Sequence, residues 1–186
     1  MDSGTLRLVL FAVISGWLFY VSRRSLHLAR SHGFYRFFAW EAILALILVN
    51  SHVWFSDPLS ILHIVSWTLL LMSLILLGQG IYLIRVAGNP GSQRQDRTLF
   101  SFEKTSTLVT SGIYRYIRHP LYGSLLYLAW GVFLKEVTWY SACLVFGATL
   151  CLVATAKADE AECVRYFGSS YEEYLSRTKM FVPLLF

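Results

Sequence analysis

Charged residues are scarce in this chain of 186 residues, and their scarcity excludes an ordinary soluble domain. Asp, Glu, Lys and Arg make up 15% of the sequence, whereas soluble domains carry about 25%. Hydrophobic residues make up 56% of it, and the mean hydropathy is +0.54. A chain of this length corresponds to one domain, so we expect residues 1–186 to form a single all-α domain that is embedded in a membrane.

Cysteine is also scarce, and its spacing argues against two kinds of site. Cys143, Cys151 and Cys163 form no C-x-x-C motif, so the sequence indicates neither a zinc site nor a dithiol redox centre. We interpret the three thiols as packed or reduced side chains, and we expect no bound metal. No small-residue cleavage site follows the first apolar run, which we therefore interpret as a retained membrane span.

Long apolar runs are what the sequence has in place of charge. A helix that crosses a bilayer needs about 20 apolar residues, and most of the runs reach that length. The fourth run is shorter and must place Pro120 and its neighbours at the membrane interface. The sequence therefore predicts about five transmembrane helices, or four if the short run is re-entrant. The runs are Leu8–Val21, Phe37–Phe55, Leu59–Val86, Leu121–Leu134 and Val137–Ala156.

The basic residues fall almost entirely on one side of these spans. With five spans, every Lys and Arg except Arg7 and Lys135 lies in a segment on the same side of the membrane. Because basic segments stay in the cytoplasm, we expect the N-terminus outside and the C-terminus inside. This asymmetry explains the net charge of +5, so no nucleic-acid partner is needed.

The expected spans divide the chain into three parts. Residues 1–87 hold three N-terminal spans, residues 88–120 form a cytoplasmic loop, and residues 121–186 form a helical hairpin with a C-terminal segment. The loop is long and contains several leucines and phenylalanines, so we expect it to fold against the membrane domain. Beyond a break at Gly168, the segment Tyr171–Met180 is predicted to be an amphipathic helix.

A charged cluster precedes the fourth apolar run, where anchoring alone would not require it. Arg118 and His119 stand directly before Pro120, and proline favours the first position of a helix, whose free N–H groups attract anions. Asp159 and Glu160 leave the membrane at the same level. Together the two clusters predict a pocket for a zwitterion, such as a cofactor that carries an amino acid. A purely structural ion pair between Arg118 and Glu160 is the alternative.

Two stretches of the second half carry a family resemblance. "LVTSGIYRYIRHPLYGSLL" and, later, "DEAECVRYFGSSYEEYLSRTKMFVP" resemble the isoprenylcysteine carboxyl methyltransferase family in the order and spacing of its motifs. The resemblance covers roughly residues 106–183, and the first three spans match only as apolar helices. This family belongs to a wider group of membrane methyltransferases, which includes phospholipid N-methyltransferases and some thiol methyltransferases.

The resemblance implies S-adenosylmethionine as the cofactor, bound in a cytoplasmic pocket over the last two spans and closed by the loop and the C-terminal helix. It also implies that Arg118 and Glu160 are catalytic, with Arg118 steadying a carboxylate and an acidic residue taking the cofactor's ammonium or orienting the acceptor. The cofactor-binding residues that it implies are Thr107, Leu108, Val109, Gly112, Tyr114, His119, Pro120, Leu121, Tyr122, Asp159 and Glu160.

The chain departs from the family pattern at a few positions. Asp159-Glu160 replaces a common Glu-Glu pair, and Ser106 stands where a histidine often begins the loop motif. Thr155 stands where prenylcysteine enzymes have an arginine that faces the substrate. Lys157 lies close to that position, and we therefore predict that Lys157 and Arg118 contact the acceptor.

The function that the resemblance implies is methyl transfer to a lipophilic acceptor that enters from the bilayer. Carboxyl O-methylation fits the family best, and N-methylation of a phospholipid or S-methylation of a thiol are alternatives. A sterol-reductase-like enzyme that binds NADPH through Arg94 and Arg97 is a further alternative. The last alternative is a membrane assembly protein that does not catalyse a reaction.

Overall fold

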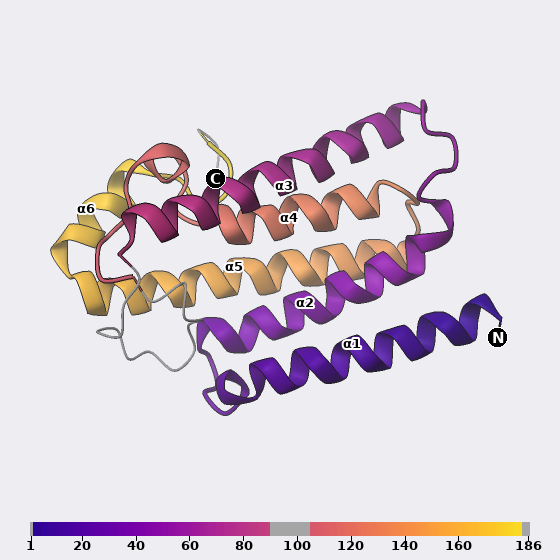
Figure 1. Cartoon of the computed structure of the whole chain (residues 1–186), viewed down its shortest axis with the longest axis horizontal. Coiled ribbons are helices and arrows are strands. Elements are labelled where there is room, and N and C mark those ends of the chain that lie inside the picture. Colours follow the sequence, from indigo (N-terminus) through magenta and orange to yellow (C-terminus); the bar gives the residue numbers. More distant parts are fainter. Residues whose placement is uncertain (1, 90–104, 184–186) are drawn as a thin grey trace.

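The computed structural model describes residues 2–89 and 105–183, and these residues fold as a bundle of helices (Figure 1). No β-strand occurs among them, and an isolated parallel bridge joins Ile117 to Lys179. The all-α prediction is confirmed. In chain order the elements are α1 (Ser3–Leu26), α2 (His32–Val49), η1 (Asn50–Val53), α3 (Ile61–Ala87), η2 (Gly112–Arg115), α4 (Pro120–Phe133), α5 (Trp139–Phe167) and α6 (Ser169–Arg177).

Local sequence sets where the helices begin and end. Four helices, α1, α2, α3 and α5, start after a polar N-cap whose side chain accepts a backbone N–H of the first turn. Helix α4 instead starts with Pro120 in its first turn, as the sequence predicts. Gly168 separates α5 from α6 and has a φ of +61°, a conformation that glycine adopts without steric penalty. The predicted break is therefore confirmed.

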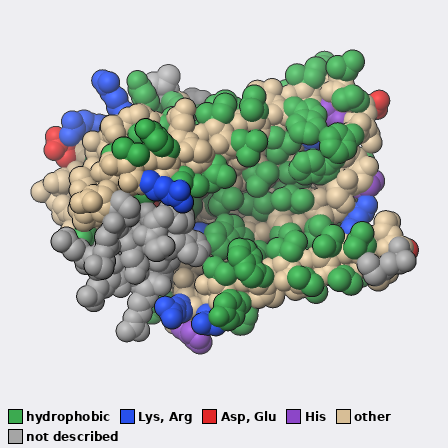
Figure 2. Space-filling model, viewed as in Figure 1, with side chains coloured by type: hydrophobic (Ala, Val, Ile, Leu, Met, Phe, Trp, Pro, Cys, Tyr) green, Lys and Arg blue, Asp and Glu red, His purple; other side chains and the backbone are tan. Residues whose placement is uncertain are grey.

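The helices pack in pairs. Helix α3 lies along α4, α2 lies along α5, and α1 lies along α2 on the outside of the bundle (Figure 1). A buried core between α2, α4 and α5 contains Leu46, Val132 and Val145, each with no exposed surface. Hydrophobic side chains also cover much of the outer face (Figure 2). Apolar residues on both the inside and the outside of a bundle are typical of helices that face lipid.

Four of the described helical segments are long and apolar enough to cross a membrane: α1, α2 with η1, α3 and α5. The fifth expected span is α4, which has 14 residues. At about 1.5 Å per residue it is about 21 Å long, short of the roughly 30 Å of a hydrocarbon core. The count of five full spans is therefore not confirmed, and four long spans with one short apolar helix describe the structure.

Buried side chains from η1 and α3 donate hydrogen bonds to backbone carbonyls at the end of α4. Asn50 donates a hydrogen bond to the carbonyl of Val132 at 3.0 Å, and Ser66 donates one to that of Gly131 at 2.6 Å. His63 donates from Nε2 to the carbonyl of Lys135 at 2.9 Å. The Val132 carbonyl also accepts the backbone N–H of Lys135 at 3.1 Å, and a helix end otherwise leaves several carbonyls without intrahelical partners. The buried polar residues therefore replace the water that an interfacial helix end would contact.

Basic residues concentrate at the end of the bundle that carries α6. The end of α1, the start of α2, the end of α3 and helix α6 all lie there (Figure 1), and most of the Lys and Arg side chains visible in Figure 2 gather toward it. Arg7 and Lys135 lie at the opposite end, near the start of α1 and after α4. The segregation matches the sequence, while the assignment of the α6 end to the cytoplasm stays a prediction.

Candidate functional site

The site is built around the chain segment that enters α4. This segment pairs with the segment that follows α6: the N–H of Arg118 donates to the carbonyl of Lys179 at 2.8 Å, and that of His119 to Met180 at 3.2 Å. In return, the N–H of Lys179 donates to the carbonyl of Tyr116 at 3.0 Å. Residues 61 to 63 positions apart in the sequence thereby hold each other in place, and the backbone that carries the two side chains before Pro120 is fixed.

The two charged clusters that the sequence singles out meet at this point. Arg118 Nε lies 2.8 Å from Glu160 Oε1, and its Nη1 donates to the carbonyls of Thr178 and, at 3.4 Å, Leu175. His119 lies between the two acids, with Nε2 3.2 Å from Glu160 Oε1 and Nδ1 3.5 Å from an Asp159 carboxylate oxygen. The structure therefore brings Arg118, His119, Asp159 and Glu160 into one network.

The network sets the charge of His119. Burial alone would lower its pKa, but hydrogen bonds and attraction from Asp159 and Glu160 outweigh burial and raise the pKa above its ordinary value. The His119 ring also stacks on Tyr122, with ring centroids 5.4 Å apart and planes 24° apart. An imidazole held between two carboxylates and a tyrosine ring is a fixed group that can help to orient a polar ligand, and the raised pKa favours its protonated form.

A cavity opens beside this network and encloses about 680 Å³ of space, part of it open to solvent. We call it the charged cavity. Nine of the residues that the sequence predicts as site residues line it: Leu108, Val109, Tyr114, Arg118, His119, Pro120, Leu121, Tyr122 and Asp159.

Four predicted residues do not line the charged cavity. Glu160 stands behind Arg118 and His119. The Thr107 N–H donates to the carbonyl of Gly88 at 3.3 Å. Gly112 has a φ of +59°, and a Cβ there would lie 2.6 Å from a methyl carbon of Leu83, so its role is to let the backbone pass close to α3. Lys157 is exposed on α5, and the structure does not bring it into the site.

Several residues that line the charged cavity are not predicted from the sequence, including aromatic ones from the end of α5 and from α6. The Tyr174 hydroxyl donates to the carbonyl of Tyr114 at 2.6 Å, and the rings of Phe167 and Tyr171 stack with centroids 6.4 Å apart. The spacing F-G-x-x-Y-x-x-Y was the available signal for these rings. The missed residues are Ile84, Thr105, Cys163, Phe167, Tyr171 and Tyr174.

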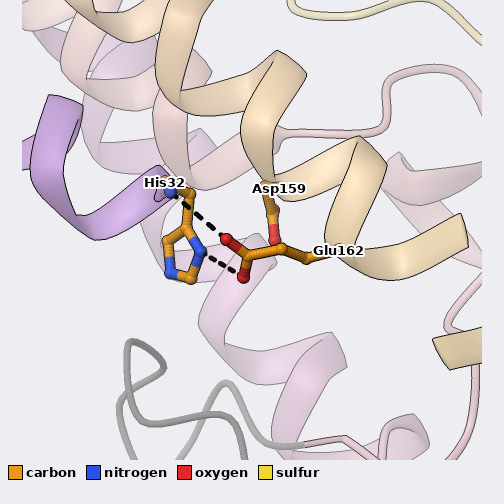
Figure 3. A group of neighbouring side chains, drawn as sticks. All are labelled: His32, Asp159 and Glu162. Atoms are coloured by element: carbon orange, nitrogen blue, oxygen red, sulfur yellow. Dashed lines mark hydrogen bonds and ion pairs between the residues drawn. The ribbon is translucent and has the colours of Figure 1, made fainter. Parts of the chain in front are cut away.

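A second group of polar side chains ties α2 to α5 on the side away from Glu160. His32 Nδ1 lies 2.7 Å from Glu162 Oε2, and the His32 backbone N–H donates to the other carboxylate oxygen at 3.3 Å (Figure 3). Asp159 lies beside them, and the three side chains offer ligand atoms within 4.8 Å of one another. The hydrogen bonds account for His32 and Glu162 as a structural tie, and the absence of a bound metal stays a prediction.

A larger cavity of about 1,230 Å³ lies between α2, α3 and α4. We call it the apolar cavity because tryptophan, leucine and isoleucine side chains form most of its wall. Leu121 and Tyr122 line both cavities, so the first turn of α4 separates the charged space from the apolar one. Arg36 is the one charged residue among the described residues that line the apolar cavity.

Long apolar helices around a charged cavity define a multi-pass membrane protein. Residues 62–170, more than half of the chain, match the family model described as phospholipid methyltransferase, and the chain belongs to that family. It is also 34% identical over 84 residues to the Protein-S-isoprenylcysteine O-methyltransferase of Schizosaccharomyces pombe, a match that covers 44% of this chain and 35% of that protein. No solved structure matches the chain.

Proposed function

We propose that the protein transfers a methyl group from S-adenosylmethionine to a lipophilic acceptor that reaches the site from the bilayer. One observation carries the proposal: a charged cavity and an apolar cavity meet at Leu121 and Tyr122. A methyltransferase of lipids must bring a polar donor and an apolar acceptor to one point, and the start of α4 is such a point. The family match supports the same reaction class.

The residues of the charged cavity fit a methyl donor that carries an amino acid. Arg118 and His119 supply positive charge for a carboxylate, and Asp159 supplies negative charge for an ammonium group. Apolar and aromatic walls from Leu108, Tyr171 and their neighbours suit a flat heterocycle. When bound, S-adenosylmethionine would supply a methyl group that is activated by a positively charged sulfur.

The chain's own contribution is mainly orientation, which can account for about 7–11 kcal/mol of a barrier between two bound reactants. Glu160 and two backbone carbonyls fix the Arg118 guanidinium. Asp159 and Glu160 fix the His119 ring. These contacts hold the polar groups rigidly before any ligand arrives, so that little freedom is lost when one binds.

The apolar cavity supports a lipophilic acceptor, and the named relative supports O-methylation. A carboxylate acceptor is already a nucleophile and needs no base. An amine or a thiol must lose a proton, and Glu160, the base that the sequence suggests for such an acceptor, bonds to Arg118 and His119 and lines neither cavity. Carboxyl O-methylation is therefore our leading proposal, with N- and S-methylation as its alternatives.

Ligand titration tests this proposal. We expect purified protein in detergent to bind S-adenosylhomocysteine in calorimetry and to transfer labelled methyl groups to an added lipid. His119→Ala and Tyr122→Phe should weaken binding while the protein remains folded, since both side chains line the charged cavity. Binding of NADPH in place of S-adenosylhomocysteine would favour the reductase alternative, and binding of neither by folded protein would favour an assembly protein.

A further inference from the structure

Arg36 occupies an unusual place in the apolar cavity. Its side chain lies on the second turn of α2 and is 4% exposed. The guanidinium carbon lies 5.1 Å from the ring centroid of Trp40, another residue of the cavity wall. A charged side chain on a membrane-embedded helix is costly and usually functional. Anchoring at the membrane interface does not explain why Arg36 is buried, so Arg36 is a candidate functional residue.

Arg36 lies at the end of the apolar cavity that is nearest the charged network. It stands one turn after His32, which bonds to Glu162 of α5, and it shares the cavity wall with Leu121 and Tyr122. Arg36 has further contacts within the chain, but a guanidinium carries five N–H donors in a planar fork. It can therefore keep a protein partner and still bind two oxygens of a ligand.

We propose that Arg36 selects acceptors with a carboxylate at the reacting end, holding that group beside Tyr122 while the hydrocarbon chain fills the apolar cavity. The inference rests on the proposed function and narrows its substrate class. Charge complementarity is the reason: a buried cation attracts a carboxylate and repels the ammonium of an aminophospholipid. Arg36 is a specificity-determining residue, distinct from the groups that line the charged cavity.

The charge of Arg36 also favours release of the methylated product. When a carboxylate oxygen forms the new bond to the methyl carbon, the bond from sulfur to that carbon breaks and its electron pair stays on sulfur. No proton is released, and the lipid changes from an anion to a neutral ester. Arg36 then loses its ion pair with the lipid, so the product binds more weakly than the substrate. The same residue that selects the acid thereby favours departure of the ester.

Quenching of tryptophan fluorescence tests the assignment without requiring methyl transfer. Trp40, Trp54 and Trp67 line the apolar cavity, and bromine quenches tryptophan on contact. The probes are 9,10-dibromostearic acid, at a pH where it is ionised, and its methyl ester. Trp17 and Trp139, which are 62% and 79% exposed, are replaced by Phe so that lipid outside the cavity contributes less signal.

We expect the acid to bind about tenfold or more tightly than the ester, as a hydrogen-bonded charge predicts. Arg36→Met should bring the ratio close to one, and Arg36→Lys, which keeps the charge without the fork, should leave an intermediate ratio. The second variant keeps the test valid if the first does not fold. Equal binding of acid and ester by the unmodified cavity, or a ratio unchanged in Arg36→Met, would overturn the assignment.

Lys135 provides a matched control, because it is a second buried cation that contacts a tryptophan of the cavity wall without lining the cavity itself. It is also 4% exposed, and its Nζ lies 3.7 Å from the ring centroid of Trp67. Lys135→Met should leave the preference for the acid intact. Loss of the preference in this variant alone would place the carboxylate beside Lys135 and refute the role of Arg36. A preserved preference without S-adenosylhomocysteine binding would refute the methyltransferase proposal and leave Arg36 as a lipid-binding residue.

Discussion

The two ends of α4 use buried polar residues in different ways. At the start of the helix, Arg118, His119 and two acids form a charged network beside a cavity. At its other end, Asn50, His63 and Ser66 donate hydrogen bonds to backbone carbonyls. The first set lies beside a cavity that we propose binds a ligand, and the second set completes the helix end. Polar residues within a membrane protein therefore serve function or fold, depending on what they face.

The largest expected effect comes from the charged network. Glu160→Gln removes the anion that holds Arg118 and His119, and we expect methyl transfer to fall about a hundredfold, or about 3 kcal/mol in the barrier. Because both side chains of the Arg118–Glu160 pair are less than one-fifth exposed, stability should fall by more than the ~0–1 kcal/mol of a surface pair. Steady-state kinetics and thermal unfolding measure the two effects.

An exchange of the two charges separates catalysis from structure at this pair. Arg118→Glu combined with Glu160→Arg retains an ion pair but reverses the sign of each group. We expect stability to recover in part and methyl transfer to remain low. Recovery of activity in the double variant would show that the pair acts only as a structural link.

The second effect concerns the opposite end of α4. Asn50 is fully buried, donates to the Val132 carbonyl at 3.0 Å and accepts the Ser141 hydroxyl at 3.1 Å, so Asn50→Ala removes buried hydrogen bonds. We expect a loss of about 1–3 kcal/mol in the free energy of unfolding, with unchanged affinity for S-adenosylhomocysteine. Ser51→Ala, at an exposed neighbour, is the control and should stay within about 0.5 kcal/mol. A loss of affinity without a loss of stability would contradict the comparison.

A third and smaller effect is the pH dependence of His119. Its pKa is raised in the folded protein, so the protonated form stabilises the fold below the ordinary pKa and this contribution disappears as pH rises through the raised value. At low pH, we expect the unmodified protein to unfold at a higher temperature than His119→Gln, by about 2–4 °C for each kcal/mol that the protonated ring contributes to stability. The gap should close at high pH. A gap that is constant across the pH range would exclude a charged His119.

The smallest effect is expected at Lys157. Its side chain is exposed and lines neither cavity, so Lys157→Ala should change the acceptor KM by no more than about twofold, as for a surface substitution. Arg36→Met is the comparison, with a much larger rise expected for an acidic acceptor. A selective rise in KM for Lys157→Ala would restore Lys157 as a substrate contact.

The charged network could be predicted from the sequence because it depends on local sequence patterns. Proline at the start of an apolar run predicts the start of α4, and the two charge clusters at one membrane level predict the contact of Arg118 with Glu160. The long apolar runs likewise predict the helices. These features depend on neighbouring residues and on membrane depth, both of which can be inferred from the linear sequence.

What the sequence did not predict depends on contacts between distant segments. Nothing near Ile117 indicates its bridge to Lys179. The position of His63 near the end of an apolar run is typical of an interfacial residue, but its side chain is buried and 6% exposed. In the sequence, Arg36 is one of several basic residues that could anchor the protein at the interface. In the structure, it lines the apolar cavity together with residues of α3 and α4. Burial of a polar residue is a property of the packed bundle and leaves no local pattern.

The bridge between the segment before α4 and the segment after α6 also affects how the protein is made. The N–H groups of Arg118 and His119 find their partners only after residues 179 and 180 have been synthesised. Since translation adds about 5–20 residues per second, the nascent chain spends several seconds in the membrane with the entry to α4 unpaired. Until then the charged cavity lacks one wall, so a chain that stalls in this interval holds inserted helices without a competent site.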